Sequence, residues 1–331
     1  MNLAINGFGR IGRLALRAAL KRGINVVAIN DLTDTKTLAY LLKYDSVQGT
    51  LKEDVTAGEG FIQAGKLKAR AFSEMDPSKL PWMEMKVDIV LDCTGKFKKS
   101  EDLKKHLDAG AKLVIMSAPP KSNDIRQFVM GVNNNSFNPK TDKIVSNASC
   151  TTNSLAPMVK VLDDAFGIER GFVTTVHGYT SSQGIVDMPN KDLRRGRAAA
   201  LNLVPTSTGA ATAVTEVMPH LKGKLDGMSI RVPVASGSIS DFTAILKKPA
   251  TVEQINAEFR KAASGYLKGV MLFNEEEIVS TDILGNTHTC IFDAKLTKAN
   301  GNMAKVFGWY DNEYGYSTKL VELAEFLGGK I

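Results

Sequence analysis

A strand, a glycine-rich turn and a helix open the chain, and they limit its fold more than any other feature. NLAIN (2–6) is typical of a short strand, and GFGRIG follows it directly. Apolar residues then recur at helical spacing from Ile11 to Ala19, and Gly23 ends the run. A second strand, NVVAIND (25–31), ends in an acidic residue. This order predicts a parallel β-α-β unit.

Each glycine of the turn has its own physical task. Gly7 permits the tight turn, Gly9 lets a pyrophosphate approach the backbone, and Gly12 lets the helix pack close to the strand. The helix that begins near Arg10 points its N–H groups and its positive dipole end at phosphate groups. Asp31 follows the glycine turn by about 20 residues, which is the spacing of an acidic residue that binds ribose hydroxyls. The unit is therefore predicted to bind a dinucleotide. Asp31 would repel a 2′-phosphate, which favours NAD over NADP.

The first half of the chain continues the same rhythm. Apolar strands are expected at 87–95, 112–119 and 143–147, and a helix capped by Ser100 is expected between the first two. Strands that are buried on both faces and alternate with helices indicate a parallel sheet. We therefore predict an α/β fold with a doubly wound parallel Rossmann sheet, forming a dinucleotide-binding domain over residues 1–149.

The second half has longer strand-like stretches and fewer helices between them. These stretches lie at 171–180, 227–234, 238–248, 288–296 and 303–311. Helices are expected at 251–265 and 317–329, the latter closed by glycines. The pattern predicts a second, α+β domain over residues 150–312, built on a mostly antiparallel sheet. Residues 313–331 are expected to form a C-terminal helix that packs back on the dinucleotide-binding domain.

The composition narrows the class of protein. Of the 331 residues, 44% are hydrophobic and 23% are charged, as in soluble globular proteins. No apolar run approaches the roughly 18 residues of a membrane span, and no signal peptide opens the chain. The net charge of +7 is modest for this length and no nucleic-acid motif accompanies it, so we expect no specific nucleic-acid partner. The three widely spaced cysteines favour neither a disulfide framework nor a metal site, and indicate a reducing cytoplasm.

One cysteine stands in a context that differs from that of a packing residue. In NASCTTNSLAP, Cys150 lies between two hydroxyl residues, at the domain boundary and at the start of a helix that Pro157 must kink or restart. A helix N-terminus is expected to lower the thiol pKa, and ligands of open α/β sheets bind outside the carboxyl ends of the strands. Cys150 is therefore a candidate nucleophile facing the cofactor cleft. Cys93 and Cys290 lie in apolar strands and are interpreted as packing residues.

A thiolate needs a nearby imidazole, and one histidine is suited to that role. His177 ends an apolar strand, where its side chain could enter a cleft. His106 is interpreted as part of a surface helix, His220 follows a proline, and His288 opens a strand. A thiolate beside a hydride acceptor suggests oxidation of an aldehyde through a tetrahedral adduct and a thioester. His177 would accept the thiol proton and bond the adduct oxygen, and the Cys150 N–H would complete the oxyanion site.

At these residues the chain resembles a known family. The segments INGFGRIGR, SNASCTTN, DLRRGRAAALN, PTSTGAAT and WYDNEYGYS follow one another along its length. They are similar to those of the phosphorylating, NAD-dependent glyceraldehyde-3-phosphate dehydrogenases. The resemblance implies a homotetrameric glycolytic enzyme of the cytoplasm. Its reaction would convert glyceraldehyde 3-phosphate, inorganic phosphate and NAD into 1,3-bisphosphoglycerate.

The resemblance also implies roles for individual residues. Cys150 is the implied nucleophile and His177 the implied base. The residues implied to hold the attacking phosphate are Ser149, Thr151, Thr208 and Gly209. Those implied to help hold phosphate groups are Thr180, Arg195 and Arg231, with Arg231 shared between the two sites. Implied NAD contacts are Arg10, Ile11, Asp31, Ser117 and Asn312, the last at the nicotinamide amide.

The chain departs from the family pattern at several positions. Ser154 stands where many relatives carry a second cysteine, and Met75, near the adenine, replaces a frequent arginine. Gly178 replaces a common serine or alanine, and Thr212 replaces a common lysine. VASGS (234–238) replaces the usual run after RVP. These changes put one cofactor contact and details of the substrate loops in doubt, more than the reaction.

Other functions remain open at this level. An erythrose-4-phosphate dehydrogenase would share Cys150, His177 and the fold, although the TSTGA segment favours the phosphate-dependent triose reaction. A non-catalytic NAD-binding interaction protein would leave the thiol and the imidazole idle. A cysteine hydrolase would leave the dinucleotide fingerprint unexplained.

Overall fold

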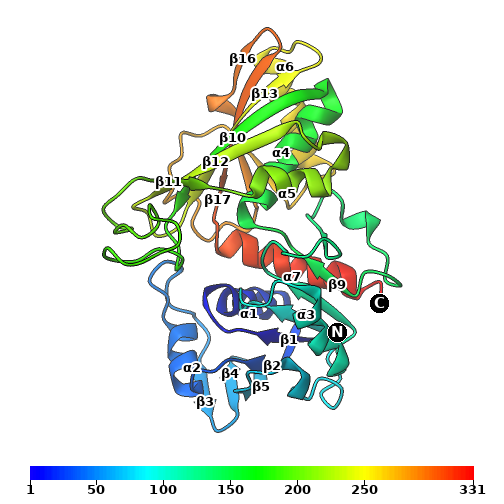
Figure 1. The fold of residues 1–331 in the computed structure, drawn as a ribbon, viewed down its shortest axis with the longest axis vertical. Coiled ribbons are helices and arrows are strands. Elements are labelled where there is room, and N and C mark those ends of the chain that lie inside the picture. The colour runs from blue at the N-terminus through cyan, green and yellow to red at the C-terminus, as the bar shows by residue number, and fades with distance from the viewer. The chain divides into compact units, whose positions relative to one another are not determined.

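Figure 1 shows the computed structural model of the protein, which describes all residues from Met1 to Ile331. The chain forms two compact units. Unit 1 comprises Met1–Phe128, Asn134–Ser149 and Ser317–Ile331, and unit 2 comprises Val129–Asn133 and Cys150–Tyr316. None of the helices is both long enough and apolar enough to cross a lipid bilayer.

Unit 1 is built on a nine-stranded sheet with the strand order β3-β4-β5-β2-β1-β6-β7-β9-β8. Its strands are β1 (Asn2–Asn6), β2 (Asn25–Asn30), β3 (Val55–Gly58), β4 (Phe61–Ala64), β5 (Leu67–Phe72), β6 (Ile89–Asp92), β7 (Leu113–Met116), β8 (Arg126–Gln127) and β9 (Ile144–Ser146). All neighbouring strands are parallel except in the β3–β4 and β4–β5 pairs, which form an edge that the sequence analysis did not predict. The predicted parallel Rossmann sheet is confirmed.

Helical segments lie on both faces of this sheet. They are α1 (Arg10–Arg22), α2 (Thr35–Lys43), α3 (Ser100–Asp108), the part of α7 (Tyr314–Gly328) from Ser317 onward, and the short turns η1 (Pro77–Lys79) and η2 (Asn134–Ser136). Gly12 of α1 lies against Ile5 on one face of the sheet. On the opposite face, Ala4 of β1 belongs to a hydrophobic core that includes Trp82. Ser100 is the first residue of α3 and not its cap, because Lys99 occupies the cap position without a side-chain bond.

Unit 2 is built on an eight-stranded sheet with the order β11-β12-β10-β13-β17-β15-β14, to which β16 adds by pairing with β17. Its strands are β10 (Ile168–Gly178), β11 (Val204–Ser207), β12 (Leu225–Val232), β13 (Ser238–Leu246), β14 (Met271–Asn274), β15 (Cys290–Asp293), β16 (Lys298–Asn300) and β17 (Met303–Tyr310). Only the β10–β12 and β14–β15 pairs are parallel. The sheet is mixed and mostly antiparallel, as predicted.

One face of the unit 2 sheet is covered by helices. These are α4 (Cys150–Phe166), α5 (Ala210–Val217) and α6 (Val252–Ser264), with η3 (Pro219–Leu221) and η4 (Ala294–Leu296) in the connections. Residues in β13 alternate between buried and half-buried, which is the pattern of a strand with one covered face. Helix α4 packs against β13, β15 and β17, as Figure 1 shows, and runs through Pro157 as a single helix. Of the two expected effects of Pro157, the restart of the helix is therefore absent.

Candidate functional site

Strand periodicity brings the thiol and the imidazole of unit 2 together. In β10, Val173, Thr175 and His177 point to the buried face, which packs against α4. Cys150 is the first residue of α4, and its side chain is only partly covered. The Cys150 Sγ lies 3.4 Å from the His177 Nε2. The two residues singled out in the sequence are therefore in hydrogen-bond contact.

The second nitrogen of His177 contacts groups that favour opposite charge states. His177 Nδ1 lies 2.6 Å from the Gly178 carbonyl, which can accept a hydrogen bond from an Nδ1–H and so favours the protonated ring. It also lies 2.7 Å from the Arg231 Nη1, because β10 and β12 pair in parallel with His177 opposite Arg231. Burial and the Arg231 charge lower the pKa of His177 to about 3, and the Gly178 carbonyl opposes this shift. The ring is thus neutral and able to accept a proton.

The Cys150 thiol differs from the sequence-based expectation in one respect. Burial raises the pKa of the Cys150 thiol, and this outweighs the Arg231 charge and the hydrogen bonds at the start of α4, which lower it. The groups at the helix start do lower the pKa of this thiol, as expected, but the net shift is upward because burial outweighs them. A neutral thiol in contact with a neutral imidazole is a pair between which a proton can be transferred.

The other two thiols lie in different surroundings. Burial raises the pKa of both Cys93 and Cys290 well above the usual range, and no positive charge opposes it. Cys290 is fully buried in β15, as predicted for a packing residue. Cys93 is only partly covered and lies beyond the end of β6, where it lines a cavity. Its interpretation as a packed strand residue was wrong.

One more predicted anion-binding side chain, that of Arg195, contacts β11. Arg195 donates from Nε to the Thr206 hydroxyl at 2.8 Å and from Nη2 to the Ser207 carbonyl at 3.1 Å, and Asp192 lies 3.4 Å from its Nε. Arg195 is thus a fixed side chain and not a freely solvated charge. Because Val204 of β11 pairs with Arg231 of β12, this segment runs beside the arginine that contacts His177.

The small residues predicted to hold phosphate fall into two groups. Thr208 and Gly209 stand directly before α5, and the Thr208 hydroxyl accepts a hydrogen bond from the Ala210 N–H. Thr151 is buried, and its hydroxyl shares a hydrogen bond of 2.9 Å with the Tyr310 hydroxyl. Thr180 pairs with the Ser182 hydroxyl in the loop after β10. Ser149 is the last residue of its segment in unit 1.

Asn312 is held by the segment in which the chain departs from its family. Its Oδ1 accepts hydrogen bonds from the Ser238 hydroxyl at 2.8 Å and from the Gly237 N–H at 3.0 Å. Ser238 also accepts a hydrogen bond from the Gly178 N–H. A Cβ on Gly178 would come within 2.9 Å of the Val234 carbonyl, so the departures at Gly178 and at 234–238 are linked by packing. Because these hydrogen bonds occupy the Oδ1 of Asn312, its Nδ2 is the atom that can donate a hydrogen bond to a ligand.

Unit 1 contains a cavity of about 300 Å³ at the carboxyl ends of β1, β2, β5 and β6. Its lining residues are Asn6, Gly7, Gly9, Asn30, Asp31, Leu32, Glu74, Met75, Cys93, Thr94, Lys96 and Phe97. Four of the predicted cofactor residues are among them, namely Gly7, Gly9, Asp31 and Met75. The remaining lining residues lie at or after the ends of strands and were not predicted to bind a cofactor. Their place at the carboxyl ends of parallel strands is the signal that could have identified them. Ser117 follows β7 and donates its N–H to the Asp92 carbonyl.

The turn after β1 has the properties expected of a phosphate-binding turn. Gly7 has φ +87°, and a Cβ there would lie 2.6 Å from the Thr94 nitrogen. A Cβ on Gly12 would collide with the Gly7 carbonyl, so glycine is needed for the helix to approach the turn. The Asp31 carboxylate accepts hydrogen bonds from the Phe8 N–H at 2.7 Å and the Thr33 N–H at 3.0 Å. These residues fit a dinucleotide.

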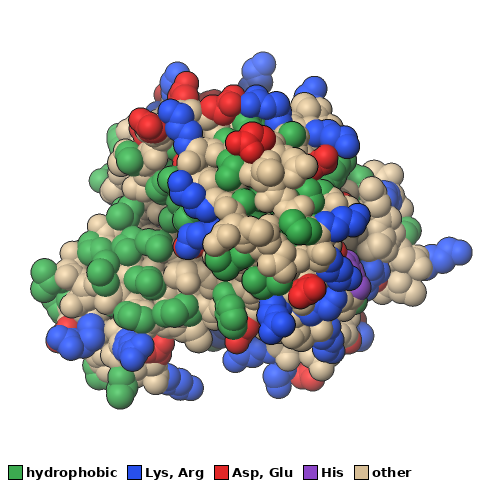
Figure 2. Space-filling model, turned by 90° about the horizontal axis from the view of Figure 1, so that it is seen from above, with side chains coloured by type: hydrophobic (Ala, Val, Ile, Leu, Met, Phe, Trp, Pro, Cys, Tyr) green, Lys and Arg blue, Asp and Glu red, His purple; other side chains and the backbone are tan.

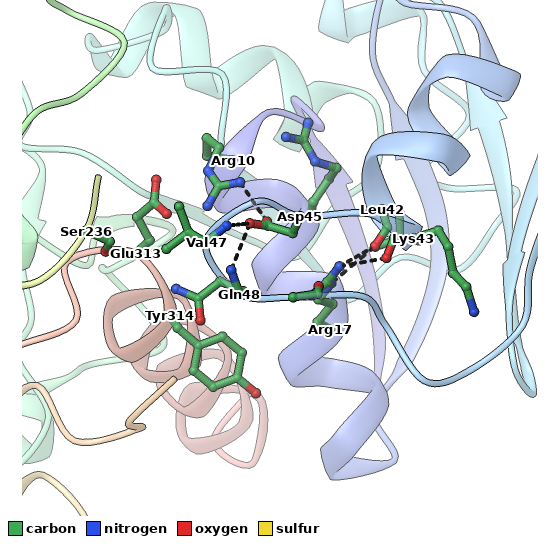
Figure 3. Close-up of polar contacts among 12 residues, drawn as sticks. Arg10, Arg17, Leu42, Lys43, Asp45, Val47, Gln48, Ser236, Glu313 and Tyr314 are labelled. Atoms are coloured by element: carbon green, nitrogen blue, oxygen red, sulfur yellow. Dashed lines mark hydrogen bonds and ion pairs between the residues drawn. The ribbon is translucent and has the colours of Figure 1, made fainter. Parts of the chain in front are cut away.

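The Arg10 side chain is held in an ion pair with Asp45. Figure 3 shows its guanidinium on Asp45, with Nη1 and Oδ2 2.6 Å apart, while Val47 and Gln48 donate N–H groups to the same carboxylate. No side chain caps the start of α1 at Gly9. What Arg10 and Ile11 offer to a phosphate is therefore the backbone at the helix start.

A dinucleotide-binding unit and a unit with a cysteine–histidine pair define the class of NAD-dependent aldehyde dehydrogenases that use a thiol. Comparison with known families agrees with this class. The family described as glyceraldehyde 3-phosphate dehydrogenase, NAD binding domain, matches residues 1–100, and the corresponding C-terminal domain matches residues 149–312. The chain belongs to the glyceraldehyde-3-phosphate dehydrogenase family.

Individual relatives are similar to the chain over almost its whole length. The glyceraldehyde-3-phosphate dehydrogenase of Mycobacterium avium is 54% identical over 336 residues, covering 99% of this chain and 98% of the relative. That of Geobacillus stearothermophilus is 53% identical and covers 100% of this chain and 99% of the relative. That of Streptomyces coelicolor is 50% identical with the same coverage.

Proposed function

We propose that this protein oxidises glyceraldehyde 3-phosphate with NAD and inorganic phosphate to 1,3-bisphosphoglycerate. The observation that carries the proposal is the contact of Cys150 Sγ with His177 Nε2, beside Arg231, in a chain that has the family's NAD-binding domain. We assign the individual steps of this reaction to the residues that were predicted from the sequence.

Cys150 and His177 carry the first half of the reaction. The Cys150 sulfur attacks the aldehyde carbon, and its proton passes to the His177 Nε2, which gives a tetrahedral adduct. The Cys150 backbone N–H and the protonated imidazole donate hydrogen bonds to the adduct oxygen. The Gly178 carbonyl stabilises the imidazolium through its Nδ1–H. An anion bound at Arg231 offsets the charge that lowers the His177 pKa, so substrate binding favours this proton transfer.

The second half of the reaction transfers the acyl group. Gly7, Gly9, Asp31 and the start of α1 would hold NAD in unit 1, and bound NAD would supply the hydride acceptor for oxidation of the adduct. The acyl group is then a thioester on Cys150. A phosphate oxygen attacks the thioester carbon, the Cys150 thiolate leaves, and the acyl phosphate is released. Arg195, Arg231, Thr208 and Gly209 supply positive charge and donors for the phosphate groups.

The direct test is an assay of the purified protein for NADH formation. Glyceraldehyde 3-phosphate, NAD and phosphate together are expected to give turnover. Omission of phosphate is expected to stop turnover after about one equivalent, because the thioester persists. Faster turnover with erythrose 4-phosphate, without a requirement for phosphate, would instead support the alternative dehydrogenase. No turnover with either aldehyde would favour a non-catalytic NAD-binding protein.

Replacing Asp31 by glycine should narrow the preference for NAD over NADP. The Asp31 carboxylate lines the cavity and is fixed by two N–H groups, so it can bond ribose hydroxyls and repel a 2′-phosphate. Removing one nearby negative charge is expected to change the ratio of kcat/KM values by about 10–100-fold. Asp31→Asn is the control that keeps an acceptor without the charge. An unchanged ratio in both variants would place cofactor selectivity elsewhere.

Arg231→Leu should cost more activity than Arg195→Leu. Arg231 contacts His177, and its Nε has no partner in the structure, whereas Arg195 is bonded to Thr206 and Ser207. Arg231→Leu is expected to raise the KM values for both the aldehyde and phosphate, and Arg195→Leu to raise mainly one of them. Initial-rate kinetics with each substrate varied in turn measure the effect. If both KM values of Arg231→Leu stayed within about twofold of the wild type, the phosphate assignment would be lost.

We also propose that the protein is a homotetramer in the cytoplasm. Large apolar side chains are exposed in the loop between β10 and β11 and on the uncovered face of the unit 2 sheet, namely Ile185, Val186, Leu193, Leu201, Leu203, Phe172 and Met228. In Figure 2, hydrophobic side chains gather on the left of the view, the side on which Figure 1 places β11. A patch of this kind indicates a partner surface. Sedimentation equilibrium would give the mass, and a monomer would contradict the assembly.

A further inference from the structure

A row of polar side chains crosses three neighbouring strands of unit 1. Asn30, Asn6 and Asp92 are the last residues of β2, β1 and β6, and the parallel register places Asn6 opposite both of the others. Asn30 Nδ2 donates to Asn6 Oδ1 at 2.7 Å, and Asn6 Nδ2 donates to Asp92 Oδ2 at 2.8 Å. All three side chains are buried. The row is therefore a directed chain of hydrogen bonds that ends on a carboxylate.

Both ends of this row reach the wall of the cofactor cavity. At one end, the Asn30 side chain is bonded to the backbone of Glu74, with its Oδ1 accepting at 2.8 Å and its Nδ2 donating at 2.9 Å. At the other end, Asp92 Oδ1 accepts from the Thr94 hydroxyl at 2.8 Å, and that hydroxyl accepts from the Lys96 N–H. Asn6, Asn30, Glu74, Thr94 and Lys96 all line the cavity. The conformation of the wall thus depends on the row.

A histidine of α3 lies behind the carboxylate. His106 is fully buried, so its interpretation as a surface residue was wrong. Its Nδ1 accepts a hydrogen bond from the Trp82 indole at 2.9 Å, and an indole N–H can only donate. The ring proton must therefore be on Nε2, which lies 3.5 Å from Asp92 Oδ2. The Asn6 amide nitrogen, 3.2 Å from the same Nε2, is a second donor and so bonds Asp92 instead.

We propose that His106 is a positioning residue for NAD, acting through Asp92. Trp82 fixes the ring tautomer, and the protonated Nε2 lies 3.5 Å from Asp92 Oδ2. Asp92 then holds Asn6 and Asn30 on one side and Thr94 on the other. His106 itself does not line the cavity, so it would act on NAD binding only through the residues that do. The inference rests on binding of NAD at this cavity.

The test compares His106→Leu with His106→Gln in direct NAD titrations by calorimetry. The leucine removes the hydrogen bond with Trp82 and the polar contact with Asp92, whereas the glutamine can accept from Trp82 and donate toward Asp92. His106→Leu is expected to raise the NAD dissociation constant by about tenfold, and His106→Gln is expected to restore most of the affinity. At saturating NAD, kcat and the aldehyde KM are expected to stay unchanged. The indole N–H resonance of Trp82 should move in His106→Leu and report directly that the network is broken.

Leu103→Ala is the matched control. Leu103 is a fully buried apolar residue of the same helix, outside the row, so this variant should lower the melting temperature and leave the NAD dissociation constant unchanged. If His106→Leu moves the Trp82 resonance but binds NAD like the wild type, the positioning role is overturned. If His106→Leu does not fold, full affinity in Asp92→Ala overturns it equally. A wild-type protein that binds no NAD would refute the cofactor assignment itself.

Discussion

Replacing Cys150 by alanine should lower kcat/KM by about 10⁴-fold or more, because no other group in unit 2 can form the thioester. Cys150 is the one thiol in contact with an imidazole and with a positive charge that opposes the rise of its pKa. The other thiols, Cys93 and Cys290, lack both. The variant should still bind NAD with the wild-type dissociation constant, since the cavity residues are unchanged. Stopped-flow NADH measurements would record the loss of the first turnover.

Alkylation gives an independent measure of the same residue. One equivalent of iodoacetamide per chain is expected to abolish activity, with the label on Cys150 in peptide mass spectrometry. Cys290→Ala is the control, because Cys290 is buried in β15 and should affect neither the labelling nor the loss of activity. If Cys93 were labelled first and activity were retained, the assignment of Cys150 as the nucleophile would be wrong.

Replacing His177 by asparagine should slow acylation by about 10²–10⁴-fold, the usual scale for a general acid–base group. The His177 Nε2 is the group in reach of the thiol proton, and its low pKa keeps it unprotonated before substrate binds. Single-turnover kinetics separate acylation from phosphorolysis and from product release. The alkylation rate of Cys150 should fall as well, because the thiol loses its proton acceptor.

His220→Asn is the matched control for this variant. His220 is an exposed histidine paired with Asp163 at 2.6 Å, so its loss removes an imidazole without touching Cys150. Its acylation rate should equal that of the wild type. An effect of less than tenfold in His177→Asn would remove His177 from the proton transfer and leave water or another group in that role.

The order of strands and helices in unit 1 could be predicted because the physical signals there are local. The glycine turn, the helical spacing after Ile11 and the acid at Asp31 each depend on residues a few positions apart. The same holds for Gly12, whose Cβ would collide with the turn just before it. Local signals also placed Cys150 at a helix start. At Pro157 they left open a kink or a restart, and α4, which packs on the sheet, continues through this residue as one helix.

Contacts between distant residues had to come from the tertiary structure. His177 and Arg231 are 54 positions apart and meet only because β10 and β12 pair in parallel. His106 was misplaced for the same reason, since its bonds to Trp82 and its approach to Asp92 arise from the docking of α3 on the sheet. The pKa of the Cys150 thiol likewise depends on burial, which the helix start does not reveal. Sequence therefore determined which residues are the candidates for the chemistry, and long-range packing decided their partners and charge states, because desolvation and register are properties of the whole fold.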